Sequence, residues 1–103
     1  MSEFGLHPEA YADLEEIWEY IADESPDAAD RLIEEIFAAI RSLVPFPYLG
    51  HIRPELTKRP QRFHNVGDYL IAYAPAEKPL VVTAVLHGRR NPRIIAAVLG
   101  QRS

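Results

Sequence analysis

The sequence predicts an α+β fold: an antiparallel helical hairpin packed on a small antiparallel sheet of three to four strands, followed by a short C-terminal helix. Two observations predict this class. Apolar residues recur at helical spacing through the first part of the chain, and from Arg62 onward they follow the pattern of strands. A chain of 103 residues is long enough for one hydrophobic core, so residues 1–103 are expected to form a single domain.

The first predicted helix begins at Pro8. Proline is favoured at a first helical position because the N–H that it lacks would have no partner there. Ala10, Leu14, Ile17 and Ile21 then recur three or four residues apart, which places them on one face of a helix. Glutamates and aspartates fill the positions between them, so the opposite face is expected to be in water.

A second helix follows almost at once. Pro26 disfavours helical geometry at Ser25, and the Ser25 side chain can cap the amides that come after it. A second apolar stripe runs from Ala29 to Leu43 and stops before Pro45. Two amphipathic helices with so short a link are expected to pack as an antiparallel hairpin.

Residues 45–61 contain four prolines and a glycine, and predict a long ordered loop. Loops of this length in compact domains often carry function. Three strands are predicted after the loop, separated by turn residues at Gly67-Asp68 and at 75–79. They are residues 62–66, 69–74 and 80–87.

The run from Leu80 to Leu86 is apolar on both faces, which is typical of a central strand that is covered on both sides. Residues 3–7 are a candidate edge strand beside this meander. Asn91-Pro92 resembles a helix cap followed by a first-turn proline, and Gly100 is a suitable end, so a short C-terminal helix is predicted.

The net charge of −4 conceals a strong asymmetry along the chain. Residues 1–50 carry twelve acidic and two basic side chains, a net charge of −10, and residues 51–103 carry three acidic and nine basic, a net charge of +6. Such a division suggests two surfaces with different roles.

Composition also bears on cofactors and location. Cysteine is absent, and the four histidines (His7, His51, His64 and His87) lie on separate predicted elements without the spacing of metal ligands. We therefore expect neither a metal nor a cofactor. The first residues lack the basic and apolar regions of a secretion signal, so a cytoplasmic location is expected.

Four segments, taken in order, carry a family resemblance. They are residues within Glu9 to Ala22; Pro26, Ala28-Ala29, Leu43 and Pro47; Gly50 to Leu56; and Arg62-Phe63, Tyr69 to Tyr73 and Val85 to Pro92. In this order they resemble the ParE branch of the RelE/ParE toxin superfamily, the toxins of bacterial type II toxin–antitoxin systems. The resemblance implies a ParD-like antitoxin as partner, with operator DNA bound only through the antitoxin complex. It also implies one of two activities, because ParE-like members poison DNA gyrase and RelE-like members cleave messenger RNA on the ribosome.

Ribonuclease chemistry needs groups that transfer protons and cations that stabilise the charge developing on phosphorus. Arg62, His87 and Arg89 are the candidates for these catalytic roles. RelE-like toxins, however, typically carry a tyrosine or histidine near the chain end, where this sequence reads Arg-Ile-Ile-Ala-Ala from Arg93. The net acidic charge also disfavours insertion among RNA phosphates. The sequence therefore favours a gyrase-inhibiting toxin without catalytic residues; the alternatives are a ribosome-dependent endoribonuclease and a non-toxic binding module.

Residues expected to bind partners lie mainly in the basic half. An acidic antitoxin segment is expected to cover the arginines, and exposed aromatic residues often anchor interfaces. A structural alternative is that Arg89 or Arg90 ties the long loop to the sheet through Glu55. The partner-binding candidates are Arg62, His87, Arg89, Arg90, Arg93 and Trp18.

Overall fold

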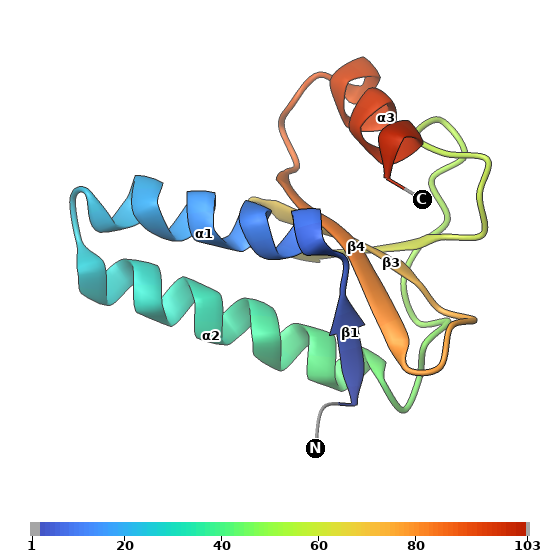
Figure 1. Ribbon diagram of the computed structural model, residues 1–103, viewed down its shortest axis with the longest axis horizontal. Helices are drawn as coiled ribbons and strands as arrows, with labels where there is room; N and C mark the ends of the chain where they lie inside the picture. Colours follow the sequence, from blue (N-terminus) through green and yellow to red (C-terminus); the bar gives the residue numbers. More distant parts are fainter. Residues whose placement is uncertain (1–2, 103) are drawn as a thin grey trace.

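The computed structural model describes residues 3–102 and contains a helical hairpin, a four-stranded sheet and a short C-terminal helix (Figure 1). The predicted fold class is confirmed. In chain order the elements are β1 (Phe4–Leu6), α1 (Pro8–Ala22), α2 (Pro26–Leu43), β2 (Arg62–Val66), β3 (Tyr69–Ala74), β4 (Leu80–His87) and α3 (Pro92–Gln101).

The strand order is β1-β4-β3-β2, and β3 runs antiparallel to both of its neighbours. The predicted edge strand is present as β1, but it pairs parallel to β4, so the sheet is mixed and not wholly antiparallel. Tight turns between β2, β3 and β4 impose antiparallel pairing. No such turn joins β1 to β4, since the helices and the other two strands lie between them in the chain.

The hairpin covers one face of the sheet, and its two apolar stripes form the larger core with side chains of β3 and β4. The buried members are Ala10, Leu14, Ile36, Ile40, Leu43, Ile71, Tyr73, Leu80, Val82 and Val85. On the other face, α3 and Leu56 of the long loop cover a second cluster that includes Phe63, Leu70, Ala84, Leu86, Ile95 and Leu99. The strand β4 is thus covered on both faces, as predicted.

Side chains cap the N-termini of all three helices. The Ser25 hydroxyl accepts a hydrogen bond from the Ala28 amide (3.2 Å), and the side-chain oxygen Oδ1 of Asn91 accepts one from the Arg93 amide (2.9 Å). His7 caps α1 through Nδ1, so the edge strand ends one residue earlier than predicted. A proline follows each cap, which confirms the predicted helix starts.

A β-bulge sets the register of β4. Ala72 pairs with Ala84 but Tyr73 pairs with Val82, so Thr83 is an extra residue on β4. The bulge changes the alternation of side chains and lets Val82 and Val85 face the same core. Because β1 pairs only with Leu80–Val82, no strand within residues 3–102 accompanies the outer edge of β4 beyond that point.

The loop after α2 is ordered, as predicted, and contacts the sheet through its backbone. The amide of Gly50 donates to the buried hydroxyl of Tyr73 (2.9 Å), and His51 and Phe63 exchange two backbone hydrogen bonds of 2.8 Å. Burial raises the pKa of Tyr73, which keeps this hydroxyl neutral. No helix within residues 3–102 is long and apolar enough to cross a membrane.

Candidate partner-binding surfaces

The end of β4 and the start of α3 form a basic end of the molecule, made of His87, Arg89, Arg90 and Arg93. The turn between the two elements is fixed locally, because Nδ1 of His87 accepts a hydrogen bond from the Arg89 amide (3.2 Å) and its carbonyl accepts one from the Arg90 amide. The His87 ring also packs edge-on against Tyr69 at 5.3 Å between centroids.

The arginines of this basic end reach into solvent. The Arg89 guanidinium is 82% exposed and lies 3.8 Å from the carboxylate of Asp68, a contact that contributes little in water. Arg90 and Arg93 are also exposed. The turn and the start of α3 therefore carry three exposed cations within five residues.

Arg62 does not belong to this basic end. In the sheet register Arg62 pairs with Tyr73, whereas His87 pairs with Tyr69, so the two residues lie at opposite ends of the strands. Arg62 Nη1 donates to the backbone oxygens of Tyr48 (3.3 Å) and Gly50 (3.1 Å). Its guanidinium also lies 5.3 Å from the centroid of the Tyr48 ring. Here Arg62 holds the loop on the sheet.

The suggested link through Glu55 is wrong. Glu55 pairs with Arg53 at 2.6 Å, which lowers the pKa of Glu55, and Arg89 lies against Asp68. The Arg53 side chain is two residues away in the same stretch of loop, so the pair forms at little cost in chain entropy. It is Arg62 that ties the loop to the sheet.

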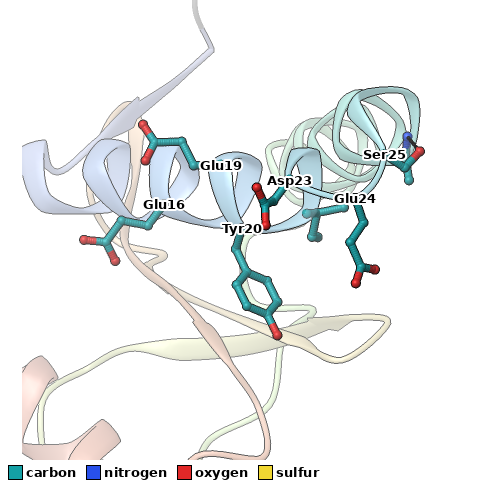
Figure 2. A pocket seen from close by; sticks show the side chains of 8 residues that line it. Glu16, Glu19, Tyr20, Asp23, Glu24 and Ser25 are labelled. Atoms are coloured by element: carbon teal, nitrogen blue, oxygen red, sulfur yellow. Dashed lines mark hydrogen bonds between the residues drawn. The ribbon is translucent and has the colours of Figure 1, made fainter.

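Trp18 is only partly available to a partner. Its indole Nε1 donates to the Asp30 carboxylate at 2.8 Å, which joins α1 to α2, and the residue is 38% exposed. Tyr20 is 80% exposed beside an open hollow of about 570 Å³ at the end of α1. Figure 2 shows its ring pointing away from α1, and the acidic side chains of Glu16 and Asp23 line the same hollow. The end of the hairpin is therefore acidic and carries an exposed aromatic residue.

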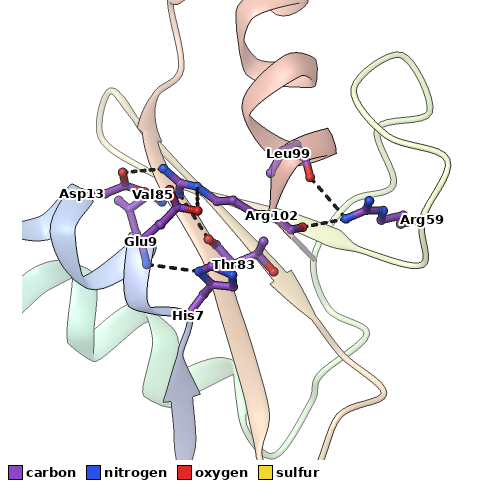
Figure 3. Close-up of polar contacts among 8 residues, drawn as sticks. All are labelled: His7, Glu9, Asp13, Arg59, Thr83, Val85, Leu99 and Arg102. Carbon is purple, nitrogen blue, oxygen red and sulfur yellow. Dashed lines mark hydrogen bonds and ion pairs between the residues drawn. The ribbon is translucent and has the colours of Figure 1, made fainter.

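A buried ion pair joins α1 to the end of the chain, and sequence reasoning missed it (Figure 3). Arg102 donates to Asp13 through Nη1 (2.6 Å) and Nη2 (2.9 Å), and each side chain is 10% exposed. The hydrogen bonds to Asp13 raise the pKa of Arg102 further. The signal in the sequence was the place of Asp13, one position before Leu14 and three after Ala10, on the apolar side of the helix.

The same pair occupies the outer edge of β4 beyond β1. Asp13 Oδ2 accepts a hydrogen bond from the Val85 amide (3.0 Å), and Arg102 Nη1 donates to the Thr83 carbonyl (3.3 Å). Nearby, at the end of α3, the Arg59 guanidinium donates to the carbonyls of Leu99 and Arg102 (Figure 3), and also to that of Gly100. The last turn of α3 is thus held from two sides.

An open cleft of about 840 Å³ lies between α1, the end of β4 and α3. Glu16 and Tyr20 line it from α1, His87 and Arg90 from the basic end, and Val98 from α3. Its walls carry opposite charges, so the acidic and basic surfaces of the molecule meet here. Among residues 3–102, no group of three or more histidine or acidic side chains is placed to hold a metal ion.

Residues 5–92 match the family model described as the ParE toxin of the type II toxin–antitoxin system parDE. The chain belongs to the ParE toxin family. The match covers the hairpin and all of the sheet except Phe4, and ends where α3 begins. Membership of this ParE family implies a cognate ParD antitoxin.

Two relatives support the assignment to the ParE family. Both are proteins named Toxin ParE2, from the CDC 1551 / Oshkosh and H37Rv strains of Mycobacterium tuberculosis. Each is 30% identical to this chain over an aligned length of 104, and the alignment covers 95% of this chain and 92% of the relative. The similarity therefore extends beyond the matched family model into α3.

Proposed function

We propose that this ParE toxin inhibits DNA gyrase by binding to it, without catalysis, and that an acidic segment of a ParD-like antitoxin neutralises it. One observation carries the non-catalytic part: the three groups that a ribonuclease would use are not assembled. Arg62 lies at the opposite end of the strands from His87 and Arg89, and its guanidinium is engaged with loop carbonyls. Gyrase as the target rests on the resemblance to ParE-like toxins that poison it.

The basic end supports the antitoxin part of the proposal. Arg89, Arg90 and Arg93 are exposed together, and they give an acidic segment three cations within a short stretch of chain. An antitoxin segment that also contacts Arg62 has to extend along the strands to the other end of the sheet.

The decisive experiment compares two activities of the same purified toxin. Supercoiling by purified gyrase is expected to fall with toxin concentration, while ribosome-dependent cleavage of messenger RNA stays at the level of a no-toxin control. His87→Ala removes the proton-transfer candidate of the ribonuclease set, so it is expected to abolish cleavage if the toxin is a ribonuclease. Strong cleavage with unchanged supercoiling would overturn the proposal in favour of the ribonuclease. Normal growth of cells that express folded toxin without antitoxin would favour a non-toxic binding module.

A further inference from the structure

A second surface lies on the long loop, away from the basic end. Four large apolar side chains within seven consecutive residues are more than half exposed, and they are four of the seven such side chains within residues 3–102. We call them the loop patch: Phe46 (66% exposed), Tyr48 (58%), Leu49 (60%) and Ile52 (63%). Apolar groups gathered in this way usually mark an interaction site.

The backbone beneath the loop patch is held rigidly. The Leu49 amide donates to the Phe46 carbonyl (3.0 Å), which closes a turn, and Gly50 is pressed against Tyr73. Arg62 adds hydrogen bonds to the carbonyls on both sides of Leu49. The exposed side chains are therefore presented by an ordered segment, and a partner would bind them with little further loss of chain entropy.

The stretch of chain that carries the loop patch is basic. Residues 41–62 hold five basic side chains (Arg41, Arg53, Lys58, Arg59 and Arg62) and one acidic side chain (Glu55), a net charge of +4 in a chain whose total is −4. Glu55 pairs with Arg53, and the Arg62 guanidinium lies against the Tyr48 ring of the patch. An apolar patch on a basic stretch of chain fits a partner segment in which apolar side chains are flanked by acidic ones.

We propose that the loop patch binds the apolar side chains of an acidic segment of the ParD-like antitoxin. This inference rests on the proposed function, and adds a second contact surface to the basic end. A second copy of the chain fits less well, because a symmetric pair would bring two loops of charge +4 together. A neutralising partner must remain bound for long periods, and buried apolar anchors give such complexes their stability.

The test uses the full chain and the purified antitoxin encoded beside it. Leu49→Glu and Ile52→Glu place a charge in the loop patch, and the double variant Leu49→Ser/Ile52→Ser removes apolar surface without adding charge. Ala38→Glu, at an exposed site on α2, is the matched charge control. Thermal unfolding of each free variant checks that the fold is intact, which the exposure of the substituted side chains leads us to expect.

The expected result is that each loop variant weakens antitoxin binding about tenfold or more, measured by calorimetry, while Ala38→Glu stays within about twofold of the unmodified chain. Unchanged antitoxin binding by folded loop variants would overturn the inference. Loss of gyrase inhibition with unchanged antitoxin binding would assign the loop patch to the target instead. A lower mass in sedimentation, again with unchanged antitoxin binding, would assign it to a second copy. Failure of the unmodified chain to bind the antitoxin would overturn the proposed function itself.

Discussion

Gly50 and Tyr73 are 23 residues apart in the chain, and the hydrogen bond between them places the long loop on the sheet. Tyr73 is completely buried. A Cβ at position 50 would lie 2.5 Å from the Tyr73 hydroxyl oxygen and 2.8 Å from the carbonyl oxygen of Phe63. Glycine is required at this position because of close approach to these atoms, and the backbone beneath the loop patch depends on it.

Gly50→Ala is expected to lower the free energy of unfolding by about 1–3 kcal/mol, because neither neighbour can move without disturbing the sheet. Urea denaturation measures the change. Gly100→Ala is the control, since no atom lies within 4 Å of the added Cβ and alanine is the better helix former. Equal stability of the two variants would contradict the role given to the Gly50 contact.

Burial raises the pKa of Tyr73, and also that of Tyr69, above the ordinary value of 10.0. Their ionisation is therefore easier in the unfolded chain than in the folded one. The stability that these neutral hydroxyls contribute is complete below about pH 10 and is lost as the pH rises through their folded pKa values. Denaturation midpoints are expected to fall between pH 9 and about pH 11, and to fall less in Tyr73→Phe. If the denaturation midpoint of Tyr73→Phe falls with pH as steeply as that of the unmodified chain, Tyr73 does not contribute to this pH dependence.

At the scale of elements, the shortness of β1 determines how α1 and the chain end are joined. β1 covers only the first three residues of β4, and backbone groups of Thr83 and Val85 face the side that it leaves open. Asp13 and Arg102 bond to these groups and to one another. Beyond the end of β1, these two side chains thus supply the hydrogen bonds that a longer parallel strand would make to β4, and this position against the sheet accounts for the burial of the ion pair.

Asp13→Ala is expected to lower the free energy of unfolding by about 3 kcal/mol, since it leaves the Arg102 charge and the Val85 amide without their main partner. Arg102→Ala should have a similar effect. The double variant should cost less than the sum of the two, because the residues interact directly. Arg31→Ala, on the exposed side of α2, should change stability by less than about 0.5 kcal/mol. If the losses in unfolding free energy of Asp13→Ala and Arg102→Ala simply add in the double variant, the two side chains do not stabilise the fold through their direct interaction.

At the scale of the whole molecule, the division of charge along the sequence becomes a division in space. Every acidic side chain of residues 3–50 is exposed except Asp13, and most lie on the outer faces of the hairpin. Most of the basic side chains belong to the basic end, to the stretch of chain that carries the loop patch or to the contacts that end α3. A partner therefore meets negative electrostatic potential on one side of this small toxin and positive potential on another.

Arg89→Glu/Arg90→Glu is expected to slow association with the antitoxin on the order of tenfold at low salt, because the exposed arginines attract an acidic segment before contact. The difference should shrink as ionic strength rises. Stopped-flow measurements over a range of salt concentrations record both effects. Arg31→Glu, an exposed charge reversal on α2, should leave the rate close to that of the unmodified chain. An equal loss of association rate in the two variants would mean that the rate depends on the net charge of the toxin and not on the position of the arginines.

The sequence by itself determined the elements and the family. Helical spacing from Ala10 to Ile21, the caps at Ser25 and Asn91, and the doubly apolar run of β4 were sufficient to predict the helices, the meander and the covered central strand. These features follow from interactions between residues close in the chain, so composition and spacing report them. The ordered segments that resemble ParE toxins likewise identified the family that the comparison established.

Only the tertiary structure decided which distant residues meet. The parallel pairing of β1, the separation of Arg62 from His87, and the ion pair between Asp13 and Arg102, 89 residues apart, depend on sheet register and on the path of the chain. The exposure of Phe46 and Ile52 and the contact of Gly50 with Tyr73 likewise belong to the path that the loop takes over the sheet. Periodicity carries no information on such long-range pairs, because many partners are compatible with the same local pattern and packing selects among them.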